Sequence, residues 1–217
     1  LWWRSHKWHN FLNHKETEVH KVYHINSYVN FCDFVVKYEQ STIFMTHQIT
    51  IVDYRPEWQE LYEQELAQLS QIIGNYAQDI QHIGSTSVPG LAAKPIIDIM
   101  IGVESLAIAD QYCVPAMVNY GYEYVKKYEV QIPHRRYFRK SDHAGKRTHH
   151  LHMVEIDSQW WERHILFRDY LRLHPSDRDA YGALKKQLAE REYEDKHDYT
   201  AAKTGFITEI LEKARLM

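Results

Sequence analysis

The sequence predicts an α+β fold in which a small mixed β-sheet carries helices on one face and is followed by a helical C-terminal part. Two short runs rich in β-branched residues, Ile80–Ile83 and Ile96–Ile101, have the length and composition of strands. Apolar residues recur at helical spacing between Pro56 and Ile73, and helix-capping signals punctuate the last third of the chain. Strands and helices are therefore expected to alternate before the chain becomes wholly helical.

The first elements expected along the chain are a strand over Ile49–Val52 and a helix that opens at Pro56. Proline suits the first turn of a helix, because the N–H that it lacks has no partner there in any case. Gly74 is expected to end this helix. Its apolar face comprises Trp58, Leu61, Tyr62, Leu66, Leu69 and Ile73.

The middle of the chain is predicted to form one interrupted helix and a group of strands. The helix runs from Glu104 to about Asn119, and Pro115 is expected to kink or break it. The polar turn Ser141–Lys146 lies between two strand-like runs and predicts a β-hairpin. The strands are expected over Tyr120–Val125, His134–Arg139 and Thr148–Ile156.

Helices are expected throughout the part of the chain that follows the hairpin. Ser158 can cap the first of them, and Pro175 breaks it. Ser176 and Asp179 have the spacing of a capping box, with Asp in place of the usual Glu, and predict the start of the second. The first two helices end near Leu173 and Tyr193, and the last spans about Tyr199–Arg215.

Composition excludes several classes of protein. The chain has 217 residues and a formal net charge of −3, which gives no electrostatic case for general nucleic-acid binding. No apolar run reaches the roughly 18 residues of a membrane span, and no secretory signal opens the chain. Two cysteines, Cys32 and Cys113, are too few for a disulfide scaffold. We therefore expect a cytoplasmic protein with a small-molecule partner, and the sequence leaves its oligomeric state open.

Residues 1–44 differ in composition from the rest of the chain. They contain no Ala, Gly or Pro and are rich in Trp, His, Asn, Lys and Tyr. A globular segment of this length normally needs Gly or Pro at its turns. We therefore expect residues 1–44 to be a non-native or disordered extension, with Met45 as the natural start and residues 45–217 as the domain. The alternative is a genuine extension whose best strand signal is Val29–Val36.

The segment His82–Asp98 combines a Gly-Ser turn with an acid in the following strand. Nucleotidyltransferases use this layout to hold a triphosphate, with phosphate against backbone N–H groups and a serine hydroxyl. Gly84 lets the backbone approach a ligand closely, and Ser85 and Thr86 supply hydroxyl donors. Together with His82, these residues are the candidate phosphate ligands. The alternative is an ordinary turn that a serine caps.

Asp98 lies inside an apolar strand, where a carboxylate is costly to bury unless it is paired or binds a metal. Nucleotidyltransferases usually carry two acids separated by one residue, so that both face the same side of the strand. Met100 occupies the second of these places here, which puts two-metal chemistry in doubt. The alternative is a buried Asp98 that is paired with Lys94 or another basic residue.

His150 and His152 are expected to face the same side of a strand, since they are two residues apart. With Asp98 they would form a divalent-metal site, whose His-His-carboxylate set suits Zn or Mn better than Mg. They would alternatively bind phosphate or act as acid and base, with Asp98 and His152 as the candidate catalytic residues. The remaining alternative is a pair of structural histidines.

Basic side chains supply further candidates for contacts with an anion. Lys94, Arg136 and Arg168 are the residues chosen for this role, and Lys203 of the last helix can join them. The guanidinium fork of arginine suits carboxylate or phosphate. The alternative for most of these residues is a salt bridge to a neighbouring acid.

From about Ile49 to Ala214 the chain resembles the GrpB-like family. The resemblance implies a nucleotidyltransferase-like fold. The activity of the family is poorly defined, and a related module fused to dephospho-coenzyme A kinases links it weakly to coenzyme A or nucleotide metabolism. The segments that carry the resemblance are Pro56–Trp58, His82–Asp98, His150–His152, Leu166–Arg172 with His174-Pro175, Tyr181, Leu184-Lys185 and Tyr199–Lys203.

Three functions are consistent with these residues. The first is a nucleotidyltransferase-like domain that binds a nucleotide or phosphorylated metabolite with a divalent metal, Mg²⁺ or Mn²⁺, and transfers a nucleotidyl group to an unknown acceptor. The second is a non-catalytic ligand-binding or folding-assistance module related to coenzyme A metabolism, which Met100 favours. The third is a mononuclear metal hydrolase, with Zn²⁺ as the corresponding ion, built on Asp98, His150 and His152.

Overall fold

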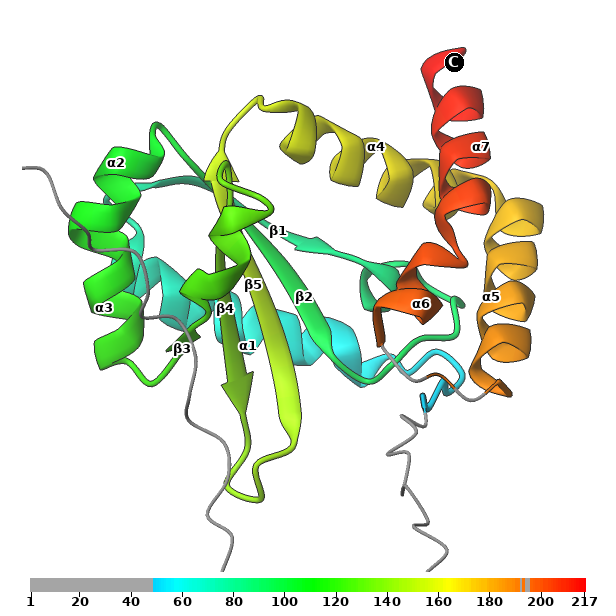
Figure 1. The fold of residues 1–217 in the computed structure, drawn as a ribbon, viewed down its shortest axis with the longest axis horizontal. Coiled ribbons are helices and arrows are strands. Elements are labelled where there is room, and N and C mark those ends of the chain that lie inside the picture. The colour runs from blue at the N-terminus through cyan, green and yellow to red at the C-terminus, as the bar shows by residue number, and fades with distance from the viewer. Residues whose placement is uncertain (1–48, 192, 194–195) are drawn as a thin grey trace, which may run out of the picture. The chain divides into compact units, whose positions relative to one another are not determined.

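The computed structural model describes residues 49–191, 193 and 196–217 (Figure 1). The expected extension over residues 1–44, with its strand signal at Val29–Val36, lies outside the described residues. Within them, the α+β class and the small mixed sheet are confirmed.

Five strands form the sheet, in the order β1-β2-β5-β4-β3. Strands β2 and β5 are parallel, and the other neighbouring pairs are antiparallel. Residues far apart in the sequence therefore become neighbours, since Asp98 of β2 lies opposite His150 of β5. The strands are β1 (Ala77–Ile83), β2 (Ile97–Val103), β3 (Glu123–Tyr124), β4 (Arg136–Ser141) and β5 (Arg147–Glu155).

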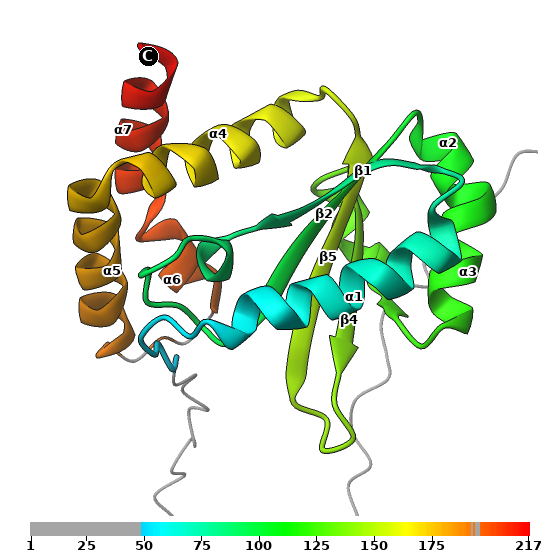
Figure 2. The same cartoon turned by 180° about the vertical axis from the view of Figure 1, so that it is seen from behind.

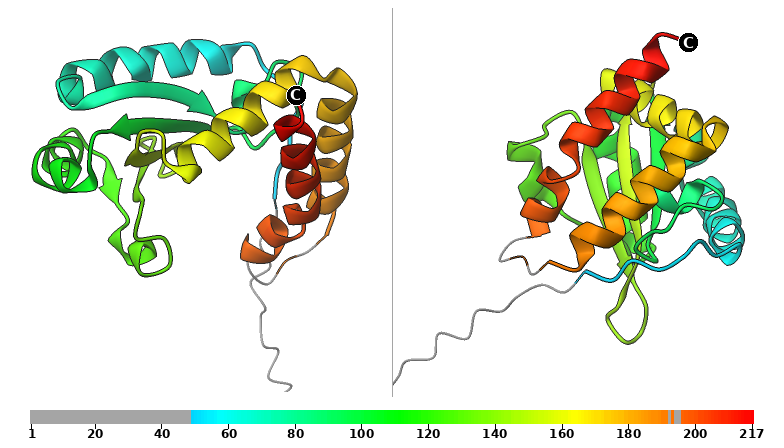
Figure 3. Two further views of the ribbon diagram at one scale, coloured as in Figure 1. Left: turned by 90° about the horizontal axis from the view of Figure 1, so that it is seen from above. Right: turned by 90° about the vertical axis from the view of Figure 1, so that its right-hand side faces the viewer.

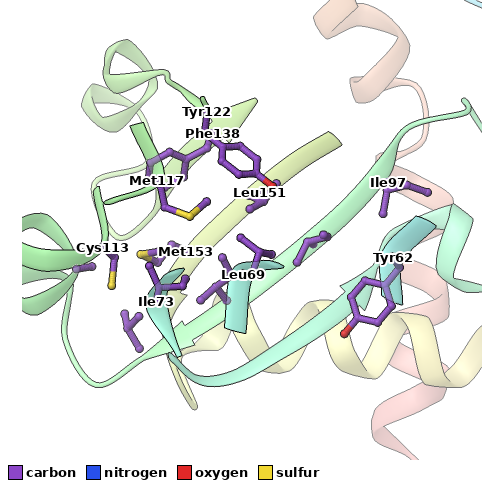
Figure 4. Packing of buried hydrophobic residues seen from close by; sticks show 14 of the residues in the cluster. Tyr62, Leu69, Ile73, Ile97, Cys113, Met117, Tyr122, Phe138, Leu151 and Met153 are labelled. Carbon is purple, nitrogen blue, oxygen red and sulfur yellow. The ribbon is translucent and has the colours of Figure 1, made fainter. Parts of the chain in front are cut away.

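The main core lies between one face of the sheet and the helices α1 (Glu57–Ile73) and α3 (Val114–Asn119) (Figure 2). Alternate residues of β2 point into it, because successive side chains of a strand face opposite sides. Ile97, Ile99, Ile101 and Val103 are accordingly almost fully buried. Figure 4 shows the packing of α1 side chains such as Leu69 against strand residues such as Leu151.

The opposite face of the sheet is covered only in part. Met100 and Val154 pack there against Trp161 of α4 (Gln159–Leu173). Figure 3 shows α4 and α1 on opposite sides of the sheet. The expected helical layer on one face is present, and α4 is added at one end of the other face. Asp98 and His150 lie on this second face and remain partly exposed.

The C-terminal helices pack against the loop that follows β1. Their core includes Leu171 and Tyr181 from the helices together with Val88 and Leu91 of the loop. Figure 1 shows the helices gathered beyond the β1–β2 side of the sheet. Besides α4, they are α5 (Pro175–Ala189), α6 (Lys196–Ala201) and α7 (Thr204–Arg215).

Helix boundaries confirm some capping predictions and correct one. Ser158 is the N-cap of α4, and its side chain accepts a hydrogen bond from the Trp161 N–H. Helix α5 starts at Pro175 with His174 as its N-cap, so the predicted capping box at Ser176 is wrong. Proline fixes a helical φ angle at this first position, which moves the helix start ahead of the serine.

Several elements differ in length from the predictions. The strand expected over Tyr120–Val125 is reduced to Glu123–Tyr124, and the helix expected to reach Tyr193 ends at Ala189. Ile49–Val52 forms only an isolated bridge between Val52 and Ala93, not a strand. The helix interrupted near Pro115 consists of α2 (Leu106–Ile108), a π-helical stretch over Ala109–Cys113 and then α3. The final helix is divided into α6 and α7. Among the described residues, no helix is both long enough and apolar enough to cross a membrane.

Candidate functional site

The turn after β1 brings Gly84 against Asp98. Gly84 has φ +69°, a conformation that side chains rarely adopt. A Cβ atom on Gly84 would lie 2.5 Å from Asp98 Oδ2, so only glycine allows this approach. Residues Ser85–Ser87 then form one 3₁₀ turn, and the Ser87 hydroxyl donates to the Gly84 carbonyl at 2.6 Å. The Gly-Ser turn and the acid of the next strand therefore form one local unit, as the sequence predicted.

Three arginines from the C-terminal helices hold the carbonyls of this segment. Arg168 donates to the His82 carbonyl at 3.0 Å, and Arg172 donates to the Ser87 carbonyl at 2.8 Å. Arg178 donates to the Pro89 carbonyl at 3.2 Å. The guanidinium of Arg168 also contacts Asp169 and Gln81, which favours the salt-bridge alternative over its predicted role as an anion ligand. These arginines position the turn.

Replacing Arg172 with Met tests this positioning role. The change removes two hydrogen bonds to the Ser87 carbonyl and leaves that oxygen unpaired. We expect a loss of about 1–2 kcal/mol in the free energy of unfolding, measured by urea denaturation. Arg163→Met, at an exposed position of the same helix, is the control and should change stability by less than about 0.5 kcal/mol. Equal effects of the two changes would contradict the positioning role.

A pocket of about 290 Å³ opens between the turn and the C-terminal helices. Among the described residues, the lining of this pocket holds three lysines and one carboxylate, that of Asp98, and it is called the lysine pocket below. Ammonium groups that gather in a concave site favour an anionic ligand. The polar residues that line it are Ser85, Thr86, Lys94, Asp98, His150, Lys185, Tyr199, Thr200 and Lys203.

Lys185 of α5 is held by two hydrogen bonds. Its ammonium donates to Ser85 Oγ at 2.8 Å and also to the Ala92 carbonyl, and the residue is buried. Burial lowers the pKa of Lys185 to about 7. Burial, with the Lys94 charge as a lesser cause, lowers the pKa of Lys203 to about 8. A bound anion would compensate both ammonium groups.

Lys94 and Lys203 meet at the ring of Tyr199. The Lys94 ammonium lies 4.5 Å from the ring centroid and that of Lys203 lies 4.4 Å from it. The structure thus places Lys94, which the sequence selected, and Lys203, which it named as a further candidate, in the same pocket as Ser85.

Asp98 and His150 form a hydrogen-bonded pair at the pocket. His150 Nδ1 lies 3.1 Å from Asp98 Oδ1, and both side chains are about 30% exposed. The parallel register of β2 and β5 places the two residues opposite each other. A carboxylate that orients an imidazole in this way is a common acid–base arrangement.

His152 does not join this pair in a metal site. Its Nδ1 atom faces Arg135 NH1 at 3.4 Å, and its ring stacks on Tyr137 and packs against Trp160. Within the described part of the chain, no group of three His, Cys, Asp or Glu side chains is arranged to hold a metal ion. The predicted ligand set of Asp98, His150 and His152 is therefore not assembled. Burial holds the pKa of His152 well below its ordinary value.

Met100 occupies an apolar environment on the side of β2 that carries Asp98. It is fully buried among Ile83, Val154 and Trp161. A second acid at this place would be surrounded by apolar side chains. The residues present do not fit a two-metal centre, which needs several carboxylates.

His82 and Thr86 contact each other below the turn. His82 Nε2 lies 3.0 Å from Thr86 Oγ1, and the imidazole stacks on Tyr62 at 4.7 Å. Burial lowers the pKa of His82 to about 4, so the ring is neutral near pH 7. Thr86 lines the pocket, whereas His82 supports the turn from inside the fold and does not line it. His82 is thus corrected from a ligand contact to a supporting residue.

Arg136 does not line the pocket, and its predicted contact with an anion stays a prediction. Its guanidinium forms a bidentate salt bridge with Asp110, at 2.5 and 2.7 Å, and donates to the Pro133 carbonyl. This arrangement is the salt-bridge alternative that the sequence also allowed.

A second cavity, of about 890 Å³, lies on the other side of the molecule. It opens between the start of α1 and the β4–β5 hairpin and is lined by Trp58, Lys146 and Arg147 among others. Neither Asp98 nor His150 lines it. Although it is larger, no carboxylate and imidazole are hydrogen-bonded to each other among its described lining residues, unlike Asp98 and His150 in the lysine pocket.

Comparisons with known proteins agree with the fold and cover most of the chain. A family model described as GrpB protein matches residues 48–213. The Glutamate-rich protein GrpB of Alkalihalophilus pseudofirmus is 40% identical over 166 residues, which cover 76% of this chain and 94% of that protein. A crystal structure of the conserved protein GrpB from Enterococcus faecalis aligns with a TM-score of 0.67 at 42% identity, over 76% of this chain and 96% of that one.

A more distant relative is a longer protein. A Dephospho-CoA kinase of Mycolicibacterium paratuberculosis is 29% identical over 188 residues, which cover 76% of this chain and 46% of that protein. The chain thus spans about half the length of this relative. Because the family model covers nearly all the described residues and close relatives match along almost their whole length, the chain belongs to the GrpB family.

Proposed function

We propose that the lysine pocket binds a phosphorylated small molecule, most simply a nucleotide, beside the Asp98–His150 pair. The observation that carries this proposal is the anchored contact of Lys185 with Ser85, in a lining with three lysines and one acid. Charge-assisted hydrogen bonds from ammonium and hydroxyl groups are suited to phosphate oxygens. The Gly-Ser turn and Asp98 follow the nucleotidyltransferase layout, and the relative named Dephospho-CoA kinase supports a phosphorylated metabolite as ligand class.

The metal-ligating side chains in this pocket are few, which limits the role that a metal ion can have there. Among the described residues that line this pocket, Asp98 is the one carboxylate, and Met100 occupies the place of the second acid. We propose that Mg²⁺ or Mn²⁺ enters only together with the phosphates of the ligand. The residues do not fit a Zn²⁺ hydrolase built on His150 and His152. Ligand binding therefore ranks above nucleotidyl transfer as the function of this site.

Calorimetric titration of the chain tests the proposal. Inorganic pyrophosphate and nucleoside triphosphates should bind, with and without Mg²⁺, whereas adenosine, which lacks phosphate, should not. Asp98→Asn should change the effect of Mg²⁺ on binding and should abolish any turnover of the nucleotide. Absence of binding by the folded protein to every phosphate compound tested would contradict the proposal.

The affinity for pyrophosphate should fall as the pH rises from 6 to 9. The pKa values of about 7 for Lys185 and about 8 for Lys203 mean that both ammonium groups lose their charge over this range. The stability of the ligand-free protein should change in the opposite sense. Because the folded-state pKa of each lysine lies below its unfolded value, the unfolded chain binds more protons above pH 7, and stability rises with pH. Titrations at pH 6, 7.5 and 9 measure the first effect, and urea denaturation measures the second.

A further inference from the structure

Arg135 is a partly buried cation that has no acidic partner among the described residues. Its Nε atom is buried and makes no hydrogen bond. Its guanidinium contacts His152 Nδ1 through Nη1, at the long distance of 3.4 Å. Burial lowers the pKa of Arg135. A guanidinium that is removed from water without a carboxylate is costly, so its presence calls for an explanation.

The side chains around Arg135 are aromatic and uncharged. The guanidinium carbon lies 5.1 Å from the centroid of the Tyr137 ring and 5.9 Å from that of Trp160. The ring of His152 lies 5.1 Å from each of these rings. Burial lowers the pKa of His152 and that of His164, the latter to about 4, so neither ring adds charge near pH 7. These three rings, Tyr137, His152 and Trp160, form an aromatic frame around one positive charge. His164 stacks on the Trp160 ring at 3.6 Å, and Tyr137 and Trp160 remain partly exposed.

This aromatic frame adjoins the Asp98–His150 pair. The ring of Tyr137 lies 5.7 Å from that of His150 and 5.1 Å from that of His152. Tyr137 belongs to β4, His152 to β5 and Trp160 to the first turn of α4, and Arg135 directly precedes β4. Figure 3 shows α4 against the sheet. A molecule held by Arg135 would thus lie beside the pair.

We propose that Arg135 binds the carboxylate of a small planar acid, which stacks against Tyr137 and Trp160 beside the Asp98–His150 pair. A guanidinium fork matches a carboxylate in shape, and one cation balances one negative charge. A phosphate would bring a second negative charge, and the lysine pocket, unlike this site, has several ammonium groups to balance it. The proposed acid is a second ligand beyond the phosphorylated one. The inference rests on the proposed function only in that both ligands would lie beside Asp98 and His150.

Saturation-transfer NMR of the full chain with benzoate tests the proposal. Benzamide, which keeps the planar ring but lacks the charge, is the control ligand. Benzoate should bind the wild-type chain and benzamide should not, and Arg135→Met should weaken benzoate binding at least tenfold. Arg135→Lys, which keeps the charge without the fork, should lie between them. Arg139→Met, in the strand that directly follows Arg135 and at an arginine paired with Glu123, should bind benzoate like the wild type.

The melting temperature of each variant separates ligand recognition from a structural role. If Arg135 serves to bind an anion, the Arg135→Met variant should melt at the wild-type temperature or higher, because the change removes an uncompensated cation from the ligand-free protein. A lower melting temperature with unchanged benzoate binding, or equal binding of benzamide, would overturn the proposal. Pyrophosphate binding should survive in Arg135→Met, so failure here is distinguishable from failure of the lysine pocket.

Discussion

The Lys185→Met variant is expected to bind pyrophosphate at least tenfold more weakly than the wild-type chain. The change removes the ammonium that contacts Ser85 Oγ and leaves Lys94 and Lys203 as the lysines of the pocket. A hydrogen bond to a charged group contributes about 1.5–3 kcal/mol, which corresponds to roughly a tenfold to hundredfold change in affinity. Calorimetric titration measures the loss.

Lys186→Met is the matched control for this change. Lys186 is the next residue of α5, but its side chain is exposed and pairs with Asp53 outside the lysine pocket. Its loss should leave pyrophosphate affinity within about twofold of the wild type. Equal weakening in the two variants would show that general positive charge, rather than the pocket, attracts the anion.

Gly84→Ala is expected to destabilise the protein by at least about 3 kcal/mol or to displace Asp98. The backbone at Gly84, with φ +69° and ψ −173°, lies in a region that is essentially restricted to glycine. The added methyl group would also lie 2.5 Å from Asp98 Oδ2 and 3.0 Å from its Cβ atom. Urea denaturation measures the loss of stability, and a weaker pyrophosphate affinity would report a disturbed turn.

Gly145→Ala separates the effect of the backbone conformation from the effect of the contact with Asp98. Gly145 also has a positive φ, +78°, but a Cβ atom there would meet no atom within 4 Å. This change should cost about 1–2 kcal/mol, the backbone contribution alone. If Gly84→Ala were no more costly than Gly145→Ala, the close approach of the turn to Asp98 would not be important for the fold.

Local features of the fold could be predicted because they depend on short-range chemistry. Pro56, Gly74 and Ser158 mark helix ends through their own backbone or side-chain preferences, and the structure places the ends there. The Gly84–Asp98 unit was predictable for a similar reason, since it joins two consecutive strands. The pairing of Asp98 with a basic residue was one of the alternatives for that carboxylate, but the sequence could not show that His150 converges on it.

Contacts between distant elements could not be read from spacing alone. Lys185 contacts Ser85 across 100 residues of sequence, and no periodicity shows which face of α5 meets the turn. Its place in a family-matching segment was the only signal available. Arg136 and Arg168 were chosen for their charge. In the structure they bind the Asp110 carboxylate and the His82 carbonyl, respectively, and both partners come from other elements.

The same limit explains the error at His152. Strand alternation places His150 and His152 on one side of β5, and this part of the prediction is confirmed by their shared neighbour Tyr137. Which group each imidazole meets depends on the segments that cover the sheet. His152 contacts Arg135 and Trp160, so its imidazole belongs to the aromatic frame and not to a metal site.

A crystal structure of the chain grown with tungstate, a phosphate mimic with a strong anomalous signal, tests the central claim most directly. The proposed function predicts an anomalous peak within about 4 Å of Lys185 Nζ and Ser85 Oγ, where the oxygens of the anion can accept hydrogen bonds. A peak confined to the larger cavity near Lys146 and Arg147, with none in the lysine pocket, would contradict it.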